Sequence, residues 1–158
     1  MIAVFDTCIV LDYLLDRSPF ADDAEALILQ VADDVTDGLI TVKSLMDIHY
    51  VLKHSLHDEK KTRQVIETLL ESFTLVDSAA DDAIRALASE TSDYEDALMI
   101  ETAIACKADC IITRNVKDYK KCPITVLSPA SFLKKIINRS SEIKRIAHLI
   151  RRWYLETA

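Results

Sequence analysis

Glycine is almost absent from this chain, because Gly38 is the single glycine among 158 residues. A loop that wraps a phosphate with its backbone needs several glycines, so both a P-loop and a dinucleotide-binding fingerprint are excluded. Three prolines and a hydrophobic fraction of 50% exclude collagen-like and low-complexity chains as well. The chain is long and apolar enough to bury a core of its own as one ordinary domain.

Long apolar runs are also missing: no uncharged stretch approaches the roughly 18 residues that a membrane helix requires. The N-terminus reaches Asp6 directly after a short apolar segment, which predicts no signal peptide. The four cysteines, at positions 8, 106, 110 and 122, have neither the spacing of a zinc site nor that of a disulfide framework. We therefore expect reduced thiols, no membrane association and a cytoplasmic location.

Negative charge dominates the composition, with a net charge of −7, but it is unevenly distributed. Residues 130–158 carry seven Lys or Arg and only two Asp or Glu. This basic segment is either a solvated helix face or a surface for nucleic acid or an acidic partner. We predict a domain at residues 1–137 and a basic helical extension at residues 138–158.

Short apolar runs alternate with segments of helical periodicity along the domain, which is typical of a parallel sheet covered on both faces. Asp37 and Gly38 are expected to form a turn, and Ser44 and Asp93 to cap helices. The predicted fold is α/β, a three-layer α/β/α sandwich with a central, mainly parallel five-stranded sheet. Strands are predicted at 2–5, 39–42, 73–76, 110–113 and 124–127, and helices at 10–15, 21–35, from 44, 58–71, 78–88, 94–107 and from 129.

Acidic side chains from distant segments are expected at one edge of this sheet, beyond the carboxyl ends of its strands, where ligands bind in such folds. Like charges at about 4 Å repel by roughly 4 kcal/mol at an effective dielectric near 20, so a cluster of this kind persists if it binds a cation or if its protons shift. Oxygen ligands prefer Mg²⁺ or Mn²⁺ over zinc. Helix capping and turn formation are the alternative roles for these side chains. The set comprises Asp6, Asp47, Asp93, Asp96, Asn115 and Asp118.

Four segments of the chain carry recognisable motifs. They are residues 6–15, which begin Asp-Thr-Cys, residues 44–48, residues 96–105, which begin Asp-Ala-Leu, and residues 113–119. In this order they resemble the motifs of the PIN-domain nucleases. The resemblance covers about residues 1–130 and implies an α/β/α sandwich and divalent-metal-dependent cleavage of RNA. Many small bacterial members are toxins of VapC-type toxin–antitoxin pairs, bound by a small antitoxin and often dimeric.

Carried over residue by residue, the resemblance implies that Asp6, Asp47 and Asp96 are metal ligands. The sequence departs from the family pattern at three positions: Cys8 replaces the usual Asn, Asp47 replaces Glu, and Asn115 replaces the fourth Asp. Asp118 is the candidate for the missing carboxylate. The expected catalytic residues are Asp6, Asp47, Asp96 and Asp118, and the expected metal ligands also include Asn115 and Asp93.

Five neighbouring residues are candidate contacts for the substrate or for bound water. Hydroxyl groups in this set can also serve as structural caps, and the two cations can also be ordinary solvated loop charges. The five are Thr7, Ser44, Thr113, Arg114 and Lys117.

The sequence thus predicts an endoribonuclease that hydrolyses RNA phosphodiester bonds with one or two Mg²⁺ or Mn²⁺ ions. Its expected partners are an RNA substrate, a small antitoxin and a second copy of the chain. Cys8 and Asn115 leave open a degenerate PIN-like module that binds RNA or protein without cutting. A phosphoacceptor signalling domain is disfavoured, because it needs an acidic pair after the first strand and this chain has only Asp6 there.

Overall fold

A five-stranded sheet forms the centre of the computed structural model, which describes residues 1–119 and 121–138. Its strand order is β3-β2-β1-β4-β5, and all four neighbouring pairs are parallel. This confirms the predicted α/β class. The strands are β1 (Ile2–Phe5), β2 (Asp37–Thr41), β3 (Thr74–Val76), β4 (Cys110–Ile112) and β5 (Thr125–Leu127).

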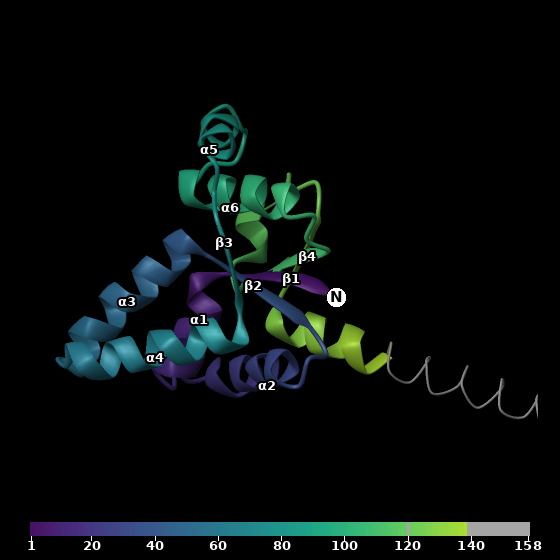
Figure 1. The fold of residues 1–158 in the computed structure, drawn as a ribbon. Helices are drawn as coiled ribbons and strands as arrows, with labels where there is room; N and C mark the ends of the chain where they lie inside the picture. The colour runs from purple at the N-terminus through teal and green to yellow at the C-terminus, as the bar shows by residue number, and fades with distance from the viewer. Residues whose placement is uncertain (120, 139–158) are drawn as a thin grey trace, which may run out of the picture.

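Helices connect the strands and cover the sheet (Figure 1). A short 3-10 helix, η1 (Val116–Tyr119), follows β4, and residues 129–138 are helical after β5. The α-helices between the strands are α1 (Thr7–Leu14), α2 (Ala21–Ala32), α3 (Val42–Leu56), α4 (Glu59–Ser72), α5 (Ala80–Leu87) and α6 (Tyr94–Ala105).

Two separate clusters of buried residues lie on the two faces of the sheet. Neighbouring strand residues point to opposite faces, so Phe5 belongs to one cluster and Val4 to the other. Helices α1 to α4 and the 129–138 segment pack on the Phe5 face, while α6 packs on the Val4 face with α5 against it (Figure 1). This confirms the three-layer α/β/α sandwich.

Two local predictions around β2 are wrong. Asp37 and Gly38 belong to the strand rather than to a turn, and the Gly38 position lies under Val31 and Phe73, where a Cβ atom would come within 3.0 Å of both side chains. A glycine therefore serves close packing here rather than a turn. The following helix begins at Val42 and not after Ser44, because the Thr41 hydroxyl accepts the Ser44 backbone N–H at 2.9 Å.

The predicted extension at 138–158 lies outside the described residues except for its first position. Across residues 1–119 and 121–138, no helix has both the length and the apolar character needed to cross a bilayer. All four cysteines are free thiols, as the sequence predicted.

Candidate active site

An acidic cleft opens at the carboxyl edge of the sheet, where the ends of β1 and β4 meet the first turns of α3 and α6. We define it by two adjoining hollows that share Asp6, Thr7, Glu95 and Asp96. One hollow adds Lys43 and Asp47 to its lining. The other adds Asp93, Asn115 and Asp118. The cleft thus brings together all six predicted metal ligands from four separate segments.

Asp6 is the most firmly held carboxylate of the cleft. It follows β1 and caps α1, where its side chain accepts the Cys8 backbone N–H at 3.3 Å. Its second oxygen accepts the Thr113 hydroxyl at 2.6 Å and the Cys8 thiol at 3.3 Å. Burial raises the pKa of that thiol to about 11, and the charge on Asp6 adds to the effect. Cys8 therefore remains a protonated donor that orients Asp6, together with the Thr113 hydroxyl.

Asp96 lies in the first turn of α6, which Asp93 caps as predicted. The Asp93 carboxylate accepts the backbone N–H groups of Glu95 at 2.8 Å and of Asp96 at 3.2 Å. Burial raises the pKa of Asp96, and the nearby charges of Asp93, Asp6 and Asp118 raise it further, while a hydrogen bond from Tyr119 acts against them. A cation bound beside Asp96 would favour its charged form and so act against the effect of burial.

Asp96→Asn is expected to stabilise the protein in the absence of metal. The pKa of Asp96 is higher in the folded chain than in the unfolded one. Protonated Asp96 therefore favours the folded state at low pH, and this stabilisation is lost as the pH rises through the pKa of the folded chain. Removing the charge should raise the melting temperature at pH 7. Thermal unfolding in EDTA between pH 4 and 8 measures this.

Asp81→Asn is the matched control, since Asp81 is also an acidic residue in a first helical turn but lies on α5, outside the lining of the cleft. We expect it to be neutral or slightly destabilising. If the Asp96 variant melts no higher than the wild type in EDTA, the charge crowding inferred for this carboxylate is wrong.

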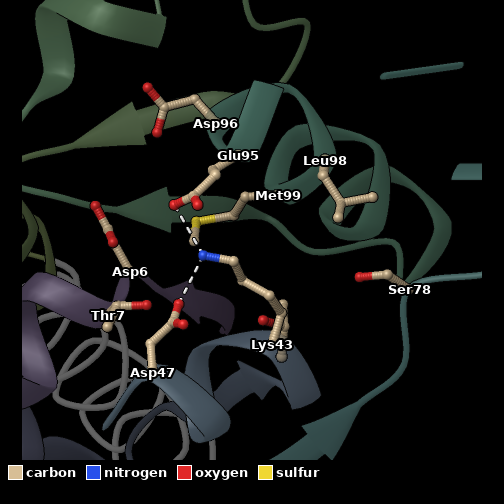
Figure 2. A pocket seen from close by; sticks show the side chains of 10 residues that line it. Asp6, Thr7, Lys43, Asp47, Ser78, Glu95, Asp96, Leu98 and Met99 are labelled. Atoms are coloured by element: carbon tan, nitrogen blue, oxygen red, sulfur yellow. Dashed lines mark hydrogen bonds and ion pairs between the residues drawn. The ribbon is translucent and has the colours of Figure 1, made fainter. Parts of the chain in front are cut away.

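Lys43 bridges two carboxylates across the cleft. Its ammonium lies 2.6 Å from Asp47 on the same helix and 2.8 Å from Glu95 at the start of α6 (Figure 2). Burial acts to lower the pKa of Lys43, but its hydrogen bonds to the two carboxylates outweigh this and raise it. The Asp96 carboxylate is turned away from the ammonium (Figure 2). Lys43 thus neutralises one side of the cleft and leaves the other side acidic.

The loop after β4 supplies the amide and the last carboxylate. The Asn115 backbone N–H donates to the Thr113 hydroxyl at 3.0 Å, so one threonine links this loop to Asp6. Asn115 and Asp118 are both exposed and line the cleft. Lys117 lies between them in sequence and is exposed as well.

Two of the predicted substrate contacts lie elsewhere than expected. Ser44 is completely buried, and its hydroxyl accepts a hydrogen bond from Thr41 at 2.9 Å. Arg114 does not stand free in solvent: its Nε lies 3.2 Å from Asp12, and its guanidinium stacks on Phe20 at 4.4 Å. Arg114 therefore belongs to an internal ion pair.

The buried partner of Arg114 is Asp12, whose side chain on α1 is 1% exposed. Among the described residues neither of its carboxylate oxygens has a hydrogen-bond donor, although Arg17 approaches at 3.9 Å. Burial raises the pKa of Asp12, and the charges of Arg114 and Arg17 counter this. The sequence did not predict this ion pair, because an aspartate among apolar helical residues is equally consistent with an exposed position.

Sequence reasoning also missed three charged residues that line the cleft: Lys43, Glu95 and Arg17. Lys43 and Glu95 lie in first helical turns, where charged residues are usually solvated. The spacing of Lys43 and Asp47, one helical turn apart, was the available sign that a cation faces the second acidic motif.

The donor set fits a hard divalent cation in its chemistry, since carboxylate and amide oxygens are what Mg²⁺ and Mn²⁺ prefer. The Lys43 ammonium, held between two carboxylates, already shows a cation in the cleft. Within residues 1–119 and 121–138, however, no three His, Cys, Asp or Glu side chains are gathered closely enough to hold an ion. A metal ion would therefore need these side chains to rearrange before they could hold it.

A search of protein-family profiles matches the PIN domain over residues 3–117. The chain belongs to the PIN domain family. The match includes the segments of Asp6, Asp47 and Asp96 and ends one residue before Asp118. Comparison with curated proteins gives no significant match.

Solved structures of similar fold include several toxin–antitoxin complexes. One from Klebsiella pneumoniae is 26% identical, with a TM-score of 0.60 over 80% of this chain and 97% of that chain. VapBC2 from Rickettsia felis, bound to a DNA fragment from its promoter, is 19% identical, with a TM-score of 0.58 over 81% and 98%. DNA-bound VapBC from Salmonella typhimurium is 16% identical, with a TM-score of 0.58 over 82% and 98%. The latter two support the fold alone.

Proposed function

We propose that this PIN-domain protein is a divalent-metal-dependent endoribonuclease that hydrolyses RNA phosphodiester bonds. The observation that carries the proposal is the convergence of carboxylates from four segments on one cleft. The proposed metal ligands are Asp6, Asp47 and Asp96, with Asp93, Asn115 and Asp118 completing the acidic edge.

The roles of the side chains follow from how each is held. A bound Mg²⁺ or Mn²⁺ ion would supply an activated water and offset negative charge on the phosphate. Asp6 is fixed by Thr113 and Cys8, so it provides an oriented ligand. Asn115 and Asp118 approach the cleft from an exposed loop. Lys117 lies on the same loop, where it is placed to attract the RNA backbone.

We also propose that the protein acts as the toxin of a toxin–antitoxin pair and binds a small antitoxin protein. The support is the fold shared with a toxin–antitoxin complex at 26% identity over 97% of that chain. A homodimer is the oligomeric state that we propose. Co-expression with the protein encoded next to it, followed by size-exclusion chromatography with light scattering, tests both partners.

The nuclease proposal predicts metal-dependent cutting and metal-dependent stability together. Labelled single-stranded RNA and tRNA should be cleaved with Mg²⁺ or Mn²⁺ and not with EDTA. An ion that binds only the folded state stabilises it by about 2.7 kcal/mol at one hundred times Kd, which raises the melting temperature by about 5–10 °C. An unchanged melting temperature in millimolar Mn²⁺ together with uncut RNA would contradict the proposal.

A catalytically degenerate PIN domain that binds RNA or protein is the second candidate. Two observations favour it: Asn115 brings no charge to the cleft, and the described carboxylates are not gathered around one ion position. Asn115→Asp separates the candidates. Cutting that appears only in this variant supports the degenerate module, while cutting by the wild type supports the nuclease.

A further inference from the structure

The Lys43 ammonium occupies a position between two acidic segments that are far apart in sequence. Asp47 is one helical turn away on α3, but Glu95 comes from the start of α6 on the other face of the sheet. An ordinary surface pair at this helical spacing would involve Asp47 alone. The second contact, at 2.8 Å, shows that Lys43 closes the cleft across its width.

This position coincides with one side of the metal site proposed above. Asp47 is the one carboxylate that the second acidic motif contributes, and its nearer oxygen is 2.6 Å from the ammonium. An ion on Asp47 and an ammonium at that distance cannot share the same oxygen without strong repulsion. The exposed fraction of the Lys43 side chain is 38%, so solvent is available to receive it when it leaves.

We propose that Lys43 is the built-in counter-ion of the metal-free cleft, and that a divalent cation binds Asp47 and Glu95 only by displacing it. Glu95 thereby becomes a metal ligand beside the three acidic motifs. This exchange of the Lys43 ammonium for a metal ion rests on the proposed function, since it concerns the same site. It also explains why no three described carboxylates are close enough to hold an ion while Lys43 is in place.

Displacement makes metal affinity depend on a residue that does not bind metal. Two partly exposed ion pairs compete with the ion for Asp47 and Glu95, so removing both should tighten Mn²⁺ binding by about tenfold. The same removal leaves Asp47 and Glu95 unpaired near Asp6 and Asp96. The metal-free variant should therefore be less stable than the wild type and should gain more from Mn²⁺.

The test is calorimetric titration of Mn²⁺ into RNA-free protein that has been stripped with EDTA. Lys43→Met is compared with Lys53→Met, a matched control on the same helix whose ion pair, to Glu59 at 3.3 Å, lies outside the cleft. We expect about tenfold tighter binding for Lys43→Met and a change below about twofold for Lys53→Met. Adding Glu95→Gln to the Lys43→Met variant should reverse most of the gain.

A second readout needs no variant. In the wild type, Mn²⁺ should increase the rate at which acetic anhydride modifies Lys43, measured by peptide mass spectrometry, and should leave the rate at Lys53 unchanged. Equal Mn²⁺ affinities for the two methionine variants, or a Lys43 rate that Mn²⁺ does not change, would overturn the exchange.

Failure of the exchange and failure of the nuclease proposal give different results. If RNA cleavage depends on metal but Lys43→Met and Lys53→Met bind Mn²⁺ with equal affinity, the exchange is wrong and the nuclease proposal stands. If Lys43→Met binds Mn²⁺ more tightly but no variant cleaves RNA, the exchange stands and the nuclease proposal is wrong. Absence of Mn²⁺ binding in every variant overturns the exchange.

Discussion

Asp6→Asn is expected to lower metal-dependent RNA cleavage by at least about 10²-fold, because losing even an outer partner of a metal site commonly costs 10–100-fold. The substitution keeps the size of the side chain and an oxygen that can accept from Thr113 and Cys8, so the fold around β1 should survive. What it removes is the negative charge that holds the ion. Single-turnover cleavage of labelled RNA in saturating Mn²⁺ measures the loss.

Asp33→Asn is the matched control for this substitution. Asp33 is an exposed aspartate that ends α2 ahead of β2, at the opposite edge of the sheet from the cleft. The Asp33→Asn variant should cleave RNA at the wild-type rate. Cleavage by the Asp6 variant within about threefold of that rate would remove Asp6 from the proposed metal ligands.

Arg114→Met is expected to destabilise the folded protein by about 3–5 kcal/mol at pH 7, which is the cost of removing one partner of a buried ion pair. The reason is Asp12, which has no hydrogen-bond donor among the described residues and would keep only the distant Arg17 as a partner. Urea unfolding followed by circular dichroism gives the change in the free energy of unfolding.

The loss of unfolding free energy in Arg114→Met should be smaller at low pH than at neutral pH. The pKa of Asp12 is raised in the folded chain, so protonation relieves the unpaired charge at low pH, and the relief is lost as the pH rises through the folded value. The variant should therefore be closer to wild type at pH 5 than at pH 7, and adding Asp12→Asn should restore part of the stability. Arg63→Met, which breaks an exposed pair with Glu59, should cost below about 1 kcal/mol. Equal losses for the two arginine variants would contradict a special role for Arg114.

The sheet and its order of elements could be predicted from the sequence because the signals are local and periodic. Buried strands such as 2–5 are unbroken apolar runs, and Asp93 caps α6 through its own backbone neighbours. The start of α3 was predicted wrongly for a physical reason. Thr41 and Ser44 are hydroxyl residues one helical turn apart, and the sequence alone does not indicate which of them accepts the other's backbone N–H.

Most acidic residues of the cleft could be predicted from the sequence, whereas Glu95 and the cations Lys43 and Arg17 could not. Asp6 and Asp118 follow strand ends, and Asp96 opens the helix that leads to β4, so the order of elements placed all three at the same edge of the sheet. Lys43 and Arg114 are oriented by tertiary partners, Glu95 and Asp12, that no local pattern connects to them. Long flexible cations find such partners only once the chain has folded.

The bond between Thr113 and Asp6 also sets when the site can exist. Synthesis of the chain produces Asp6 and Asp47 first, Asp96 later, and Thr113 and Asp118 near the end of the PIN domain. Strand β4, which carries Thr113 to Asp6, must pair with β1 before that aspartate is fixed. A growing chain on the ribosome therefore has no finished cleft, and under the proposed function the surrounding RNA meets an active nuclease only after nearly the whole domain has emerged.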